Sequence, residues 1–487
     1  MSGALWTGAD LVAATGGRPV ADVPHKISGI SIDSRTVQPG EAFFAIKGDR
    51  FDGHDFLTGA VAAGAGLLVV SKQKLPALGK LSAPLLVVDD VLKALERLAA
   101  AARKRSQARI VAITGSVGKT TSKEALARAL APSGSVHASA ASFNNHWGVP
   151  LSLARLPAET HYAVFEIGMN HPGEIRPLVK LVRPHAAIVT LIAPAHLGFF
   201  SGLAEIAQAK GEIFEGVEPG GTAIVNADDP YGQALGEMAR KAGVSRVLTF
   251  GEAAGADFRL GAWREEGEGA LLSATIAGHS LEGRIGTRGR HIGQNVLAVL
   301  GAASVLGADV DAAAAALAEW RAGKGRGERR EIETGEAPIL LLDESYNANP
   351  TSMRAALAVL GDTPPAGDGR RVALLGDMRE LGGHSRKYHV DLAGPIAQAQ
   401  VDAVFLVGDE IRPLSGALGP AIHCEWHRTV EETQAGLAAY LKPGDVLMAK
   451  ASNAVGLSKL IERLPILIQR PDAPALDADA SGEGQPC

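Results

Sequence analysis

The central motif of the chain is Thr114-Gly115-Ser116-Val117-Gly118-Lys119-Thr120-Thr121. It follows an apolar run at 110–113 and precedes a helical pattern at 122–130. A glycine-rich turn between a strand and a helix predicts a phosphate-binding loop, because inward N–H groups and the helix N-terminus attract anions. In such a loop Lys119 reaches terminal phosphates and the Thr120 hydroxyl binds Mg²⁺ held by the nucleotide. The Gly-x-x-Gly-Lys-Thr spacing is shorter than usual, and an ordinary strand-to-helix turn is the alternative.

Composition narrows the class of protein. The 487 residues suffice for about three domains. The net charge of -5 argues against a nucleic-acid partner. Two cysteines, Cys424 and Cys487, are too few for a disulfide framework and favour a reducing compartment. Because no apolar stretch reaches the ~20 residues that a membrane span needs, we expect a cytoplasmic protein without membrane insertion.

Strand and helix patterns alternate along the chain and predict an α/β fold with mostly parallel sheets. Polar segments near 101–109 and at 323–330 mark two boundaries, and the second is predicted to be a flexible basic hinge. The expected regions are a small N-terminal α/β domain at 1–106, a central P-loop-type domain at 107–327, and a C-terminal Rossmann-like domain at 328–470. We expect a small antiparallel insertion at 257–285 and a disordered tail at 471–487.

Polar side chains follow strands of the central domain, where the ligand of a parallel sheet lies. Glu166 ends one predicted strand, and His196 follows another. A carboxylate and an imidazole beside a phosphate loop are suitable metal ligands. Each also has a simpler interpretation, since Glu166 could cap the next helix and His196 could be hydrogen-bonded within its loop. Lys210, on a helical pattern, is by spacing alone a solvated lysine.

The outer domains carry further candidates. Around Asp33-Ser34-Arg35 the loop mixes donors and acceptors, as a polar-ligand site would, although spacing alone favours a capped turn with a surface arginine. In the hinge, Arg326 could meet a phosphate. Acids and turn formers follow two strands of the third domain, in Asp343-Glu344-Ser345-Tyr346-Asn347-Ala348-Asn349-Pro350-Thr351-Ser352 and Gly376-Asp377-Met378-Arg379-Glu380-Leu381-Gly382.

In this order, the motifs resemble those of the Mur ligases of peptidoglycan precursor synthesis. The phosphate loop, with its short spacing, is similar to the ATP loop of that family. Matching segments also occur at 144–150, 166–175, 209–214, 343–350 and 376–382. The resemblance covers nearly the whole chain except the tail. The Tyr-Asn-Ala-Asn-Pro and Gly-Asp-Met-x-Glu-Leu-Gly runs point to the family member that joins D-alanyl-D-alanine to UDP-N-acetylmuramoyl-tripeptide.

The resemblance implies an enzyme that uses ATP and Mg²⁺ to form an amide through an acyl phosphate, and we expect it to be a monomer. The implied metal ligands are Thr120, Glu166, His196 and Lys210, with Lys210 carried as a carbamate. The last three of these form the catalytic set with Lys119. The implied ATP contacts are Gly115, Ser116, Val117, Gly118, Lys119, Thr120, Thr121, Asn295, Arg326, Asp343 and Glu344. The implied substrate contacts are Ser34 and Arg35 at the uridine diphosphate end, and Asn347 and Asn349 in the third domain.

One departure from the family pattern lies near the last strand. Relatives often carry Lys-Gly-Ser-Arg where this chain has Lys450-Ala451-Ser452-Asn453. Alanine loses the conformational freedom of glycine, and asparagine lacks the charge of arginine. The dipeptide contacts at this segment are therefore left open by the resemblance.

Two alternatives remain from the sequence. One is a ligase for another amino acid, such as the meso-diaminopimelate- or lysine-adding enzyme or folylpolyglutamate synthetase. The lack of an Asp-Asn-Pro-Arg motif argues against the amino-acid-adding ligase, and the N-terminal domain looks unlike that of the folate enzymes. The other alternative is an ATP-binding scaffold without catalysis, against which the intact catalytic set argues.

Overall fold

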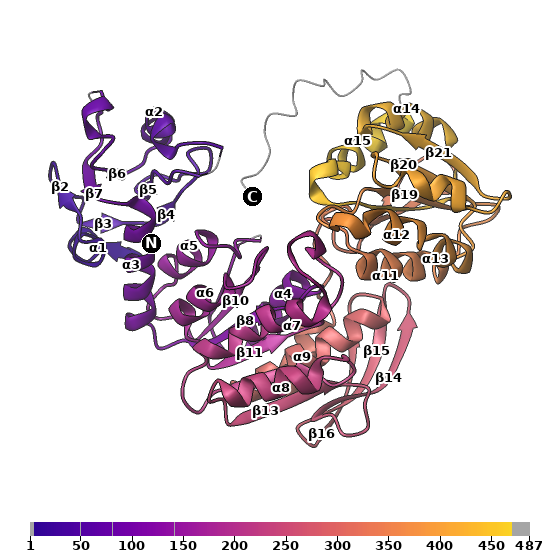
Figure 1. Cartoon of the computed structure of the whole chain (residues 1–487), viewed down its shortest axis with the longest axis horizontal. Helices are drawn as coiled ribbons and strands as arrows, with labels where there is room; N and C mark the ends of the chain where they lie inside the picture. Colours follow the sequence, from indigo (N-terminus) through magenta and orange to yellow (C-terminus); the bar gives the residue numbers. More distant parts are fainter. Residues whose placement is uncertain (1–3, 49, 80, 141, 470–487) are drawn as a thin grey trace.

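Three main β-sheets organise the protein. The computed structural model describes residues 4–48, 50–79, 81–140 and 142–469, so the tail predicted to be disordered lies outside the described residues. Figure 1 shows three α/β units in chain order, an N-terminal unit with β1–β7, a central unit with β8–β16 and a C-terminal unit with β17–β22. The predicted class, α/β with mostly parallel sheets, is confirmed. Among the helices of the described ranges, none is both long and apolar enough to cross a membrane.

The N-terminal unit is built on a five-stranded sheet in the order β2-β7-β6-β5-β4. Its strands are Arg18–Pro19 (β2), Ile30–Ser31 (β4), Ala42–Phe44 (β5), Leu67–Ser71 (β6) and Leu85–Val88 (β7). A short antiparallel pair, Trp6–Thr7 (β1) with Lys26–Ile27 (β3), lies beside it. Its helices are Gly8–Thr15 (α1), Leu57–Ala62 (α2) and Val91–Arg105 (α3). Helix α3 begins after Asp90, whose carboxylate accepts from the N–H of Lys93, and buries its apolar side in the core of the unit.

The central unit contains a nine-stranded sheet in the order β16-β15-β14-β13-β12-β11-β8-β10-β9. Its strands are Arg109–Thr114 (β8), Val136–Ala138 (β9), Tyr162–Glu166 (β10), Ala186–Val189 (β11), Thr222–Asn226 (β12), Arg246–Gly251 (β13), Phe258–Glu266 (β14), Gly269–Ile276 (β15) and His279–Ile285 (β16). The antiparallel segment expected at 257–285 is present, but it continues the main sheet because β14 pairs with β13 in parallel. The difference arises because strand pairing across a turn depends on long-range contacts.

Helices cover both faces of the central sheet, so that β8, the strand that leads into the phosphate loop, lies between two buried clusters. On one face lie Lys119–Leu130 (α4), Arg290–Val305 (α9) and Val310–Leu317 (α10). On the other lie Gly148–Ala154 (α5), Ile175–Val182 (α6), Leu203–Gly211 (α7) and Gly232–Lys241 (α8). Apolar strands such as β8 and β10, buried on both sides, are typical of parallel sheets with this cover.

The C-terminal unit has a six-stranded sheet in the order β17-β18-β22-β19-β20-β21. Its strands are Glu328–Ile332 (β17), Ile339–Asp343 (β18), Arg371–Gly376 (β19), Ala403–Val407 (β20), His423–His427 (β21) and Val446–Lys450 (β22). All pairs are parallel except that of β17 with β18. The segment 323–330 is predicted to be a flexible hinge, but strand β17 begins within it. Only the first part of that segment, 323–327, forms a turn that connects the two units. The helices are Pro350–Gly361 (α11), Ser385–Val390 (α12), Ala393–Gln398 (α13), Val430–Tyr440 (α14) and Leu457–Gln469 (α15).

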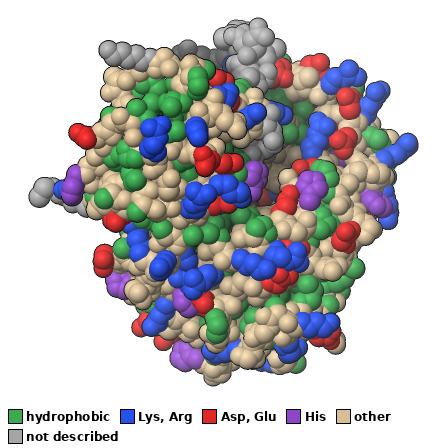
Figure 2. Space-filling model, turned by 60° about the vertical axis from the view of Figure 1, so that its left-hand side comes forward, with side chains coloured by type: hydrophobic (Ala, Val, Ile, Leu, Met, Phe, Trp, Pro, Cys, Tyr) green, Lys and Arg blue, Asp and Glu red, His purple; other side chains and the backbone are tan. Residues whose placement is uncertain are grey.

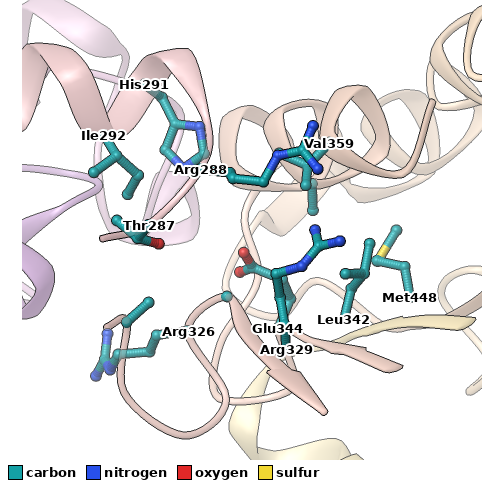
Figure 3. A pocket seen from close by; sticks show the side chains of 13 residues that line it. Thr287, Arg288, His291, Ile292, Arg326, Arg329, Leu342, Glu344, Val359 and Met448 are labelled. Atoms are coloured by element: carbon teal, nitrogen blue, oxygen red, sulfur yellow. The ribbon is translucent and has the colours of Figure 1, made fainter. Parts of the chain in front are cut away.

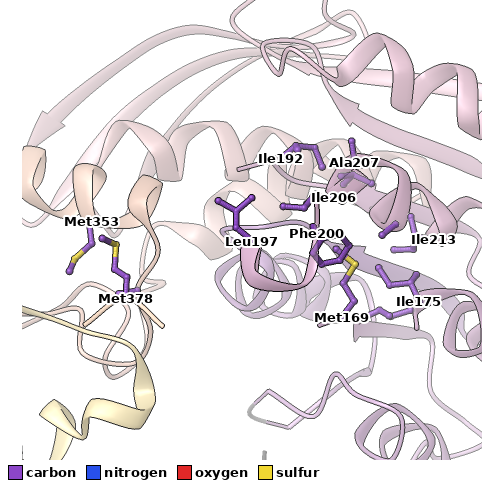
Figure 4. Packing of buried hydrophobic residues seen from close by; sticks show 14 of the residues in the cluster. Met169, Ile175, Ile192, Leu197, Phe200, Ile206, Ala207, Ile213, Met353 and Met378 are labelled. Carbon is purple, nitrogen blue, oxygen red and sulfur yellow. The ribbon is translucent and has the colours of Figure 1, made fainter. Parts of the chain in front are cut away.

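One buried apolar cluster continues from the central unit into the C-terminal unit. Figure 4 shows Leu197 and Phe200 on the central side, with Met353 and Met378 contributed by the C-terminal side. The C-terminal unit therefore lies against the loops that follow the central strands. This arrangement puts its strand-end motifs over the phosphate loop.

Candidate active site between the central and C-terminal units

The phosphate loop has the strand–turn–helix geometry predicted from the sequence. It turns from β8 into α4 through two constrained glycines. Gly118 has φ +84, and a Cβ on Gly115 would lie 1.8 Å from Oγ1 of Thr190. No side chain caps the N-terminus of α4, so its first N–H groups remain available to an anion. The Lys119 ammonium donates to the carbonyl of Gly115 at 2.8 Å, within the loop.

Glu166 faces this loop from the end of β10. Its side chain is buried, with 1% of the residue exposed. One carboxylate oxygen accepts from the Thr120 hydroxyl at 2.7 Å, and the other accepts from Nδ2 of Asn144 at 2.7 Å. The next helix, α6, has Glu174 at its N-cap position, so the interpretation of Glu166 as a helix cap is wrong. A hydroxyl and a carboxylate meet where the loop would hold phosphate.

Lys210 is buried on α7, with 1% of the residue exposed, so the interpretation as a solvated lysine is wrong. No oxygen of the described residues accepts a hydrogen bond from its amine. Burial and the nearby Lys119 ammonium lower the pKa of Lys210 well below its ordinary value. Burial also lowers the pKa of Lys119, against the opposing effect of Glu166. Two lysines therefore share a poorly solvated space, which suits a ligand with several negative charges.

His196 lies in the loop after β11, in a left-handed conformation with φ +60. Its Nδ1 contacts the carboxylate of Glu380, which belongs to the C-terminal unit. The imidazole is thus hydrogen-bonded, as the simpler interpretation expects, but across two units and not within its loop. In the part of the chain that the structure describes, no three His, Cys, Asp or Glu side chains are grouped to hold a metal ion.

Asn295 and Arg326 lie beside the phosphate loop. Asn295, on α9, packs against Gly118, where a Cβ would lie 2.8 Å from its Nδ2. The guanidinium of Arg326 stacks 3.8 Å from the ring centre of Tyr346. Both side chains donate to the hydroxyl of Ser142, at 3.0 Å and 2.7 Å respectively. The sequence did not indicate Ser142, because a single serine in a polar loop has no distinguishing pattern.

A pocket lies between α9 and the first two strands of the C-terminal unit (Figure 3). Both units contribute to its lining, with the charged side chains Arg288, Arg326, Arg329 and Glu344 and the imidazole of His291. Burial lowers the pKa of His291, which favours a neutral imidazole there. Asp343 does not line the pocket. It is buried and accepts from the N–H of Ser345 at 3.0 Å, whereas the neighbouring Glu344 faces the pocket.

The strand-end motif at 343–352 contacts the phosphate loop directly. Asn349 caps α11 by accepting from the N–H of Ser352 at 2.9 Å, and its Nδ2 donates to the carbonyl of Ser116 at 3.4 Å. Asn347 presents its carbonyl to the buried Lys450 ammonium at 3.0 Å. Because Lys450 also pairs with Glu344 at 3.1 Å, it links this motif to the end of β22.

The altered segment after β22 is accommodated without backbone strain. Ala451 is fully buried and has no positive φ, so the position does not need glycine. The Ser452 hydroxyl accepts from the N–H of Arg379 at 2.9 Å and donates to the carbonyl of Ala348 at 3.5 Å, so it joins the two strand-end motifs. The alanine therefore fits this backbone, and the missing charge at Asn453 is the difference that remains.

Ser34 and Arg35 lie apart from the phosphate loop in sequence and in unit, after β4. Arg35 forms an ion pair with Asp33 at 2.8 Å, and its N–H also donates to that carboxylate at 3.0 Å. This is the capped turn that spacing alone favoured. Figure 2 shows a hollow in the molecular surface with Lys and Arg, Asp and Glu, and His side chains on its rim.

Fold and site together define a class of enzyme with a phosphate loop at the end of a parallel sheet and a second α/β unit seated over it. Three models of the Mur ligase family match consecutive regions. They are the Mur ligase family catalytic domain at 26–103, the Mur ligase middle domain at 113–303, and the Mur ligase glutamate ligase domain at 325–453. The chain belongs to the Mur ligase family.

Curated relatives match over nearly the full length. The UDP-N-acetylmuramoyl-tripeptide–D-alanyl-D-alanine ligase of Escherichia coli is 37% identical to this chain. The match covers 90% of this chain and 94% of the relative. The enzyme of that name from Rickettsia prowazekii is 33% identical, covering 89% and 94%. A crystal structure of MurF from Acinetobacter baumannii has a TM-score of 0.82 at 32% identity, covering 96% and 100%. MurF from Thermotoga maritima in complex with ADP has a TM-score of 0.75 at 27% identity, covering 91% and 98%.

Proposed function

We propose that the chain is an ATP-dependent ligase that joins D-alanyl-D-alanine to UDP-N-acetylmuramoyl-tripeptide, giving the UDP-muramoyl pentapeptide of peptidoglycan synthesis. Relatives of that name, similar over 90% of this chain, support the substrates, and the ADP complex of a relative supports the use of ATP. The observation that carries the proposal is the contact of Asn349 with the phosphate-loop carbonyl of Ser116. It brings the C-terminal unit to the place where a terminal phosphate would lie.

Mg²⁺ fits the chemistry of the residues around the loop. The Thr120 hydroxyl and the Glu166 carboxylate are oxygen donors 2.7 Å apart, the kind of ligand that Mg²⁺ prefers. We propose that they hold the ion together with His196 and Lys210. When bound, Mg²⁺ supplies positive charge to the phosphate oxygens.

Lys210 would serve as a ligand in carbamate form. A neutral amine adds CO₂, forming an N–C bond and releasing one proton, and the product is an anion. Burial beside Lys119 lowers the pKa of Lys210 and so favours the neutral amine. The carbamate would also place a negative charge beside the Lys119 ammonium, giving an oppositely charged pair.

The reaction would proceed in two steps. The tripeptide carboxylate attacks the γ-phosphorus of ATP, the bond to the ADP oxygen breaks, and an acyl phosphate forms. Lys119 and the uncapped N–H groups of α4 stabilise the charge of the transferring phosphoryl group. The dipeptide amine then attacks the acyl carbon, an amide forms, and phosphate leaves while the amine loses a proton to solvent.

We propose the remaining roles as similarity to the Mur ligase family implies them. ATP would contact residues 115–121 together with Asn295, Arg326, Asp343 and Glu344. Ser34 and Arg35 would hold the uridine diphosphate end, and Asn347 and Asn349 would lie on the dipeptide side. The proposed domains are 1–106, 107–327 and 328–470, and each main sheet stays within one of them. We propose a cytoplasmic monomer.

The test is phosphate release with ATP, Mg²⁺ and UDP-muramoyl tripeptide, adding D-alanyl-D-alanine or single amino acids in turn. We expect turnover only with the dipeptide, and turnover with a single amino acid instead would overturn the substrate assignment. Tight ATP binding without turnover would identify a scaffold. For the metal role, Glu166→Ala should lose turnover at ordinary Mg²⁺, whereas Glu237→Ala, on the outer helix α8, should not.

A further inference from the structure

Two tripeptides of the same form meet between the central and C-terminal units. One is His196-Leu197-Gly198, after β11, and the other is Glu380-Leu381-Gly382, after β19. In each, the first residue has a positive φ, +60 and +64 respectively, and the leucine is buried. Residues other than glycine rarely adopt this conformation, so contacts with the surroundings must hold both loops in place. We call this pair of tripeptides the clasp.

Backbone and side-chain contacts join the two halves of the clasp. The N–H of Gly198 donates to the carbonyl of Glu380 at 2.8 Å. The backbones approach so closely that a Cβ on Gly382 would lie 2.9 Å from Cα of Gly198. Nδ1 of His196 contacts the Glu380 carboxylate, and both leucines belong to the cluster of Figure 4. Polar, backbone and apolar contacts thus coincide at one point of the junction.

The side-chain contact selects one tautomer of His196. An ionised carboxylate can only accept a hydrogen bond, so the proton of the imidazole lies on Nδ1. The lone pair of a neutral ring is then on Nε2, the form that binds a cation. A carboxylate from the C-terminal unit therefore determines which nitrogen of a central-unit histidine can act as a ligand.

We propose that Glu380 is a positioning residue, which holds the C-terminal unit over the phosphate loop and fixes the tautomer and orientation of His196. The first part rests on contact geometry alone, whereas the second rests on the proposed function, in which His196 is a metal ligand. Closure of the C-terminal unit and assembly of the cation site then become one linked event, so that weakening either weakens the other.

Three variants test the clasp. Glu380→Ala removes the carboxylate, Glu380→Gln keeps the shape but can present a donor to Nδ1, and Gly382→Ala places a methyl group against Gly198 at a φ of +56. The matched control is Glu410→Gln. Glu410 lies in the same unit with a similarly exposed side chain, 33% against 41% for Glu380. Among the described residues its partners, Arg379 and Ser385, belong to that unit.

Two readouts are taken on the full chain. Small-angle X-ray scattering without ligands measures the radius of gyration, and turnover as a function of Mg²⁺ measures the half-maximal Mg²⁺ concentration. We expect all three clasp variants to scatter as larger particles than the wild type and the control. We expect Glu380→Ala to raise the half-maximal Mg²⁺ by about tenfold, as loss of a partner of a metal-ligating histidine commonly does, and the control to match the wild type.

Unchanged scattering for Glu380→Ala and Gly382→Ala, each with wild-type thermal unfolding, would overturn the closing role of the clasp. Larger particles with an unchanged Mg²⁺ midpoint would overturn the role toward His196 and keep the closing role. ¹⁵N shifts of the His196 ring give a third readout, and the same tautomer in wild type and Glu380→Ala would also overturn the positioning of His196. A wild type without dipeptide-dependent turnover would overturn the proposed function, while scattering would still decide the closing role.

Discussion

The central unit joins its two neighbours in different ways. Toward the N-terminal unit, α3 packs on α5, and Leu151 and Ala154 are fully buried in the core of that unit. Arg103 of α3 adds hydrogen bonds to the carbonyls of Val182 and Arg183, at 2.8 Å and 2.9 Å. Toward the C-terminal unit, the buried apolar cluster of Figure 4 also crosses the junction, but it is joined there by separate polar contacts, from Asn349 to Ser116, from Arg326 and Tyr346 to Ser142, and from His196 to Glu380.

The difference indicates which junction moves. Opening an apolar interface exposes surface at about 25 cal/mol per Å², and nothing in water replaces those contacts. Polar contacts exchange for water at a net cost of about 1 kcal/mol each. We therefore expect the N-terminal junction to stay closed and the C-terminal junction to open when substrates enter.

The largest effect should come from the centre of the C-terminal junction. Lys119→Met removes the ammonium beside the transferring phosphoryl group and should lower kcat by about a thousandfold, as loss of one transition-state donor does. Thermal unfolding should change little, because the one hydrogen bond of the Lys119 ammonium among the described residues stays within its own loop. Lys241→Met, at the exposed end of α8, is the control for turnover. A large drop in stability with retained turnover would mean that Lys119 has a structural role at this junction and not the catalytic role proposed here.

The N-terminal junction should show the opposite pattern. Leu151→Ala leaves a cavity between α5 and α3 and should lower the free energy of unfolding by about 2–5 kcal/mol. Denaturant unfolding measures the loss, with the exposed Ile466→Ala as control. At a temperature where the variant stays folded, kcat should remain near that of the wild type. A loss below 1 kcal/mol would contradict a rigid, apolar junction.

The stability of the N-terminal unit should fall at acidic pH. Burial raises the pKa of Asp52, but hydrogen bonds from Lys74 and His54 outweigh that effect and lower it from 3.8 to about 2. A carboxyl group with a depressed folded-state pKa stabilises the fold above its unfolded pKa, and that stability is lost as the pH falls from 3.8 toward 2. Asp52→Asn should lower the free energy of unfolding by about 1–2 kcal/mol at neutral pH. The variant should also lose less stability than the wild type as the pH falls into the acidic range. An identical loss in both proteins would contradict this.

The smallest effect should come from a single polar contact of the C-terminal junction. Ser142→Ala removes the hydroxyl that accepts from Arg326 and Tyr346. We expect the KM for ATP to rise severalfold, corresponding to about 1 kcal/mol, with kcat nearly unchanged. Ser415→Ala, on the exposed side of the C-terminal unit, is the control. A fall in kcat without a change in KM would mean that Ser142 acts on the transition state.

Local patterns predicted much of the site. The phosphate loop, the α4 helix and the buried strands β8 and β10 all follow from the order of residues near them. The same local patterns misled at Lys210, because helical spacing cannot show that a neighbouring layer covers a side chain. They also missed β21, a short edge strand of mixed polarity that is defined by its pairing with β20.

By itself, the sequence determined the α/β class, the three-part order and the phosphate loop, because these depend on residues within a few positions of one another. The tertiary structure decided which carboxylate meets Thr120, that Lys119 and Lys210 share a desolvated space, and that Glu380 contacts His196. These contacts join residues far apart in the chain. Burial and charge coupling depend on distances in space, which only the packing of the units sets.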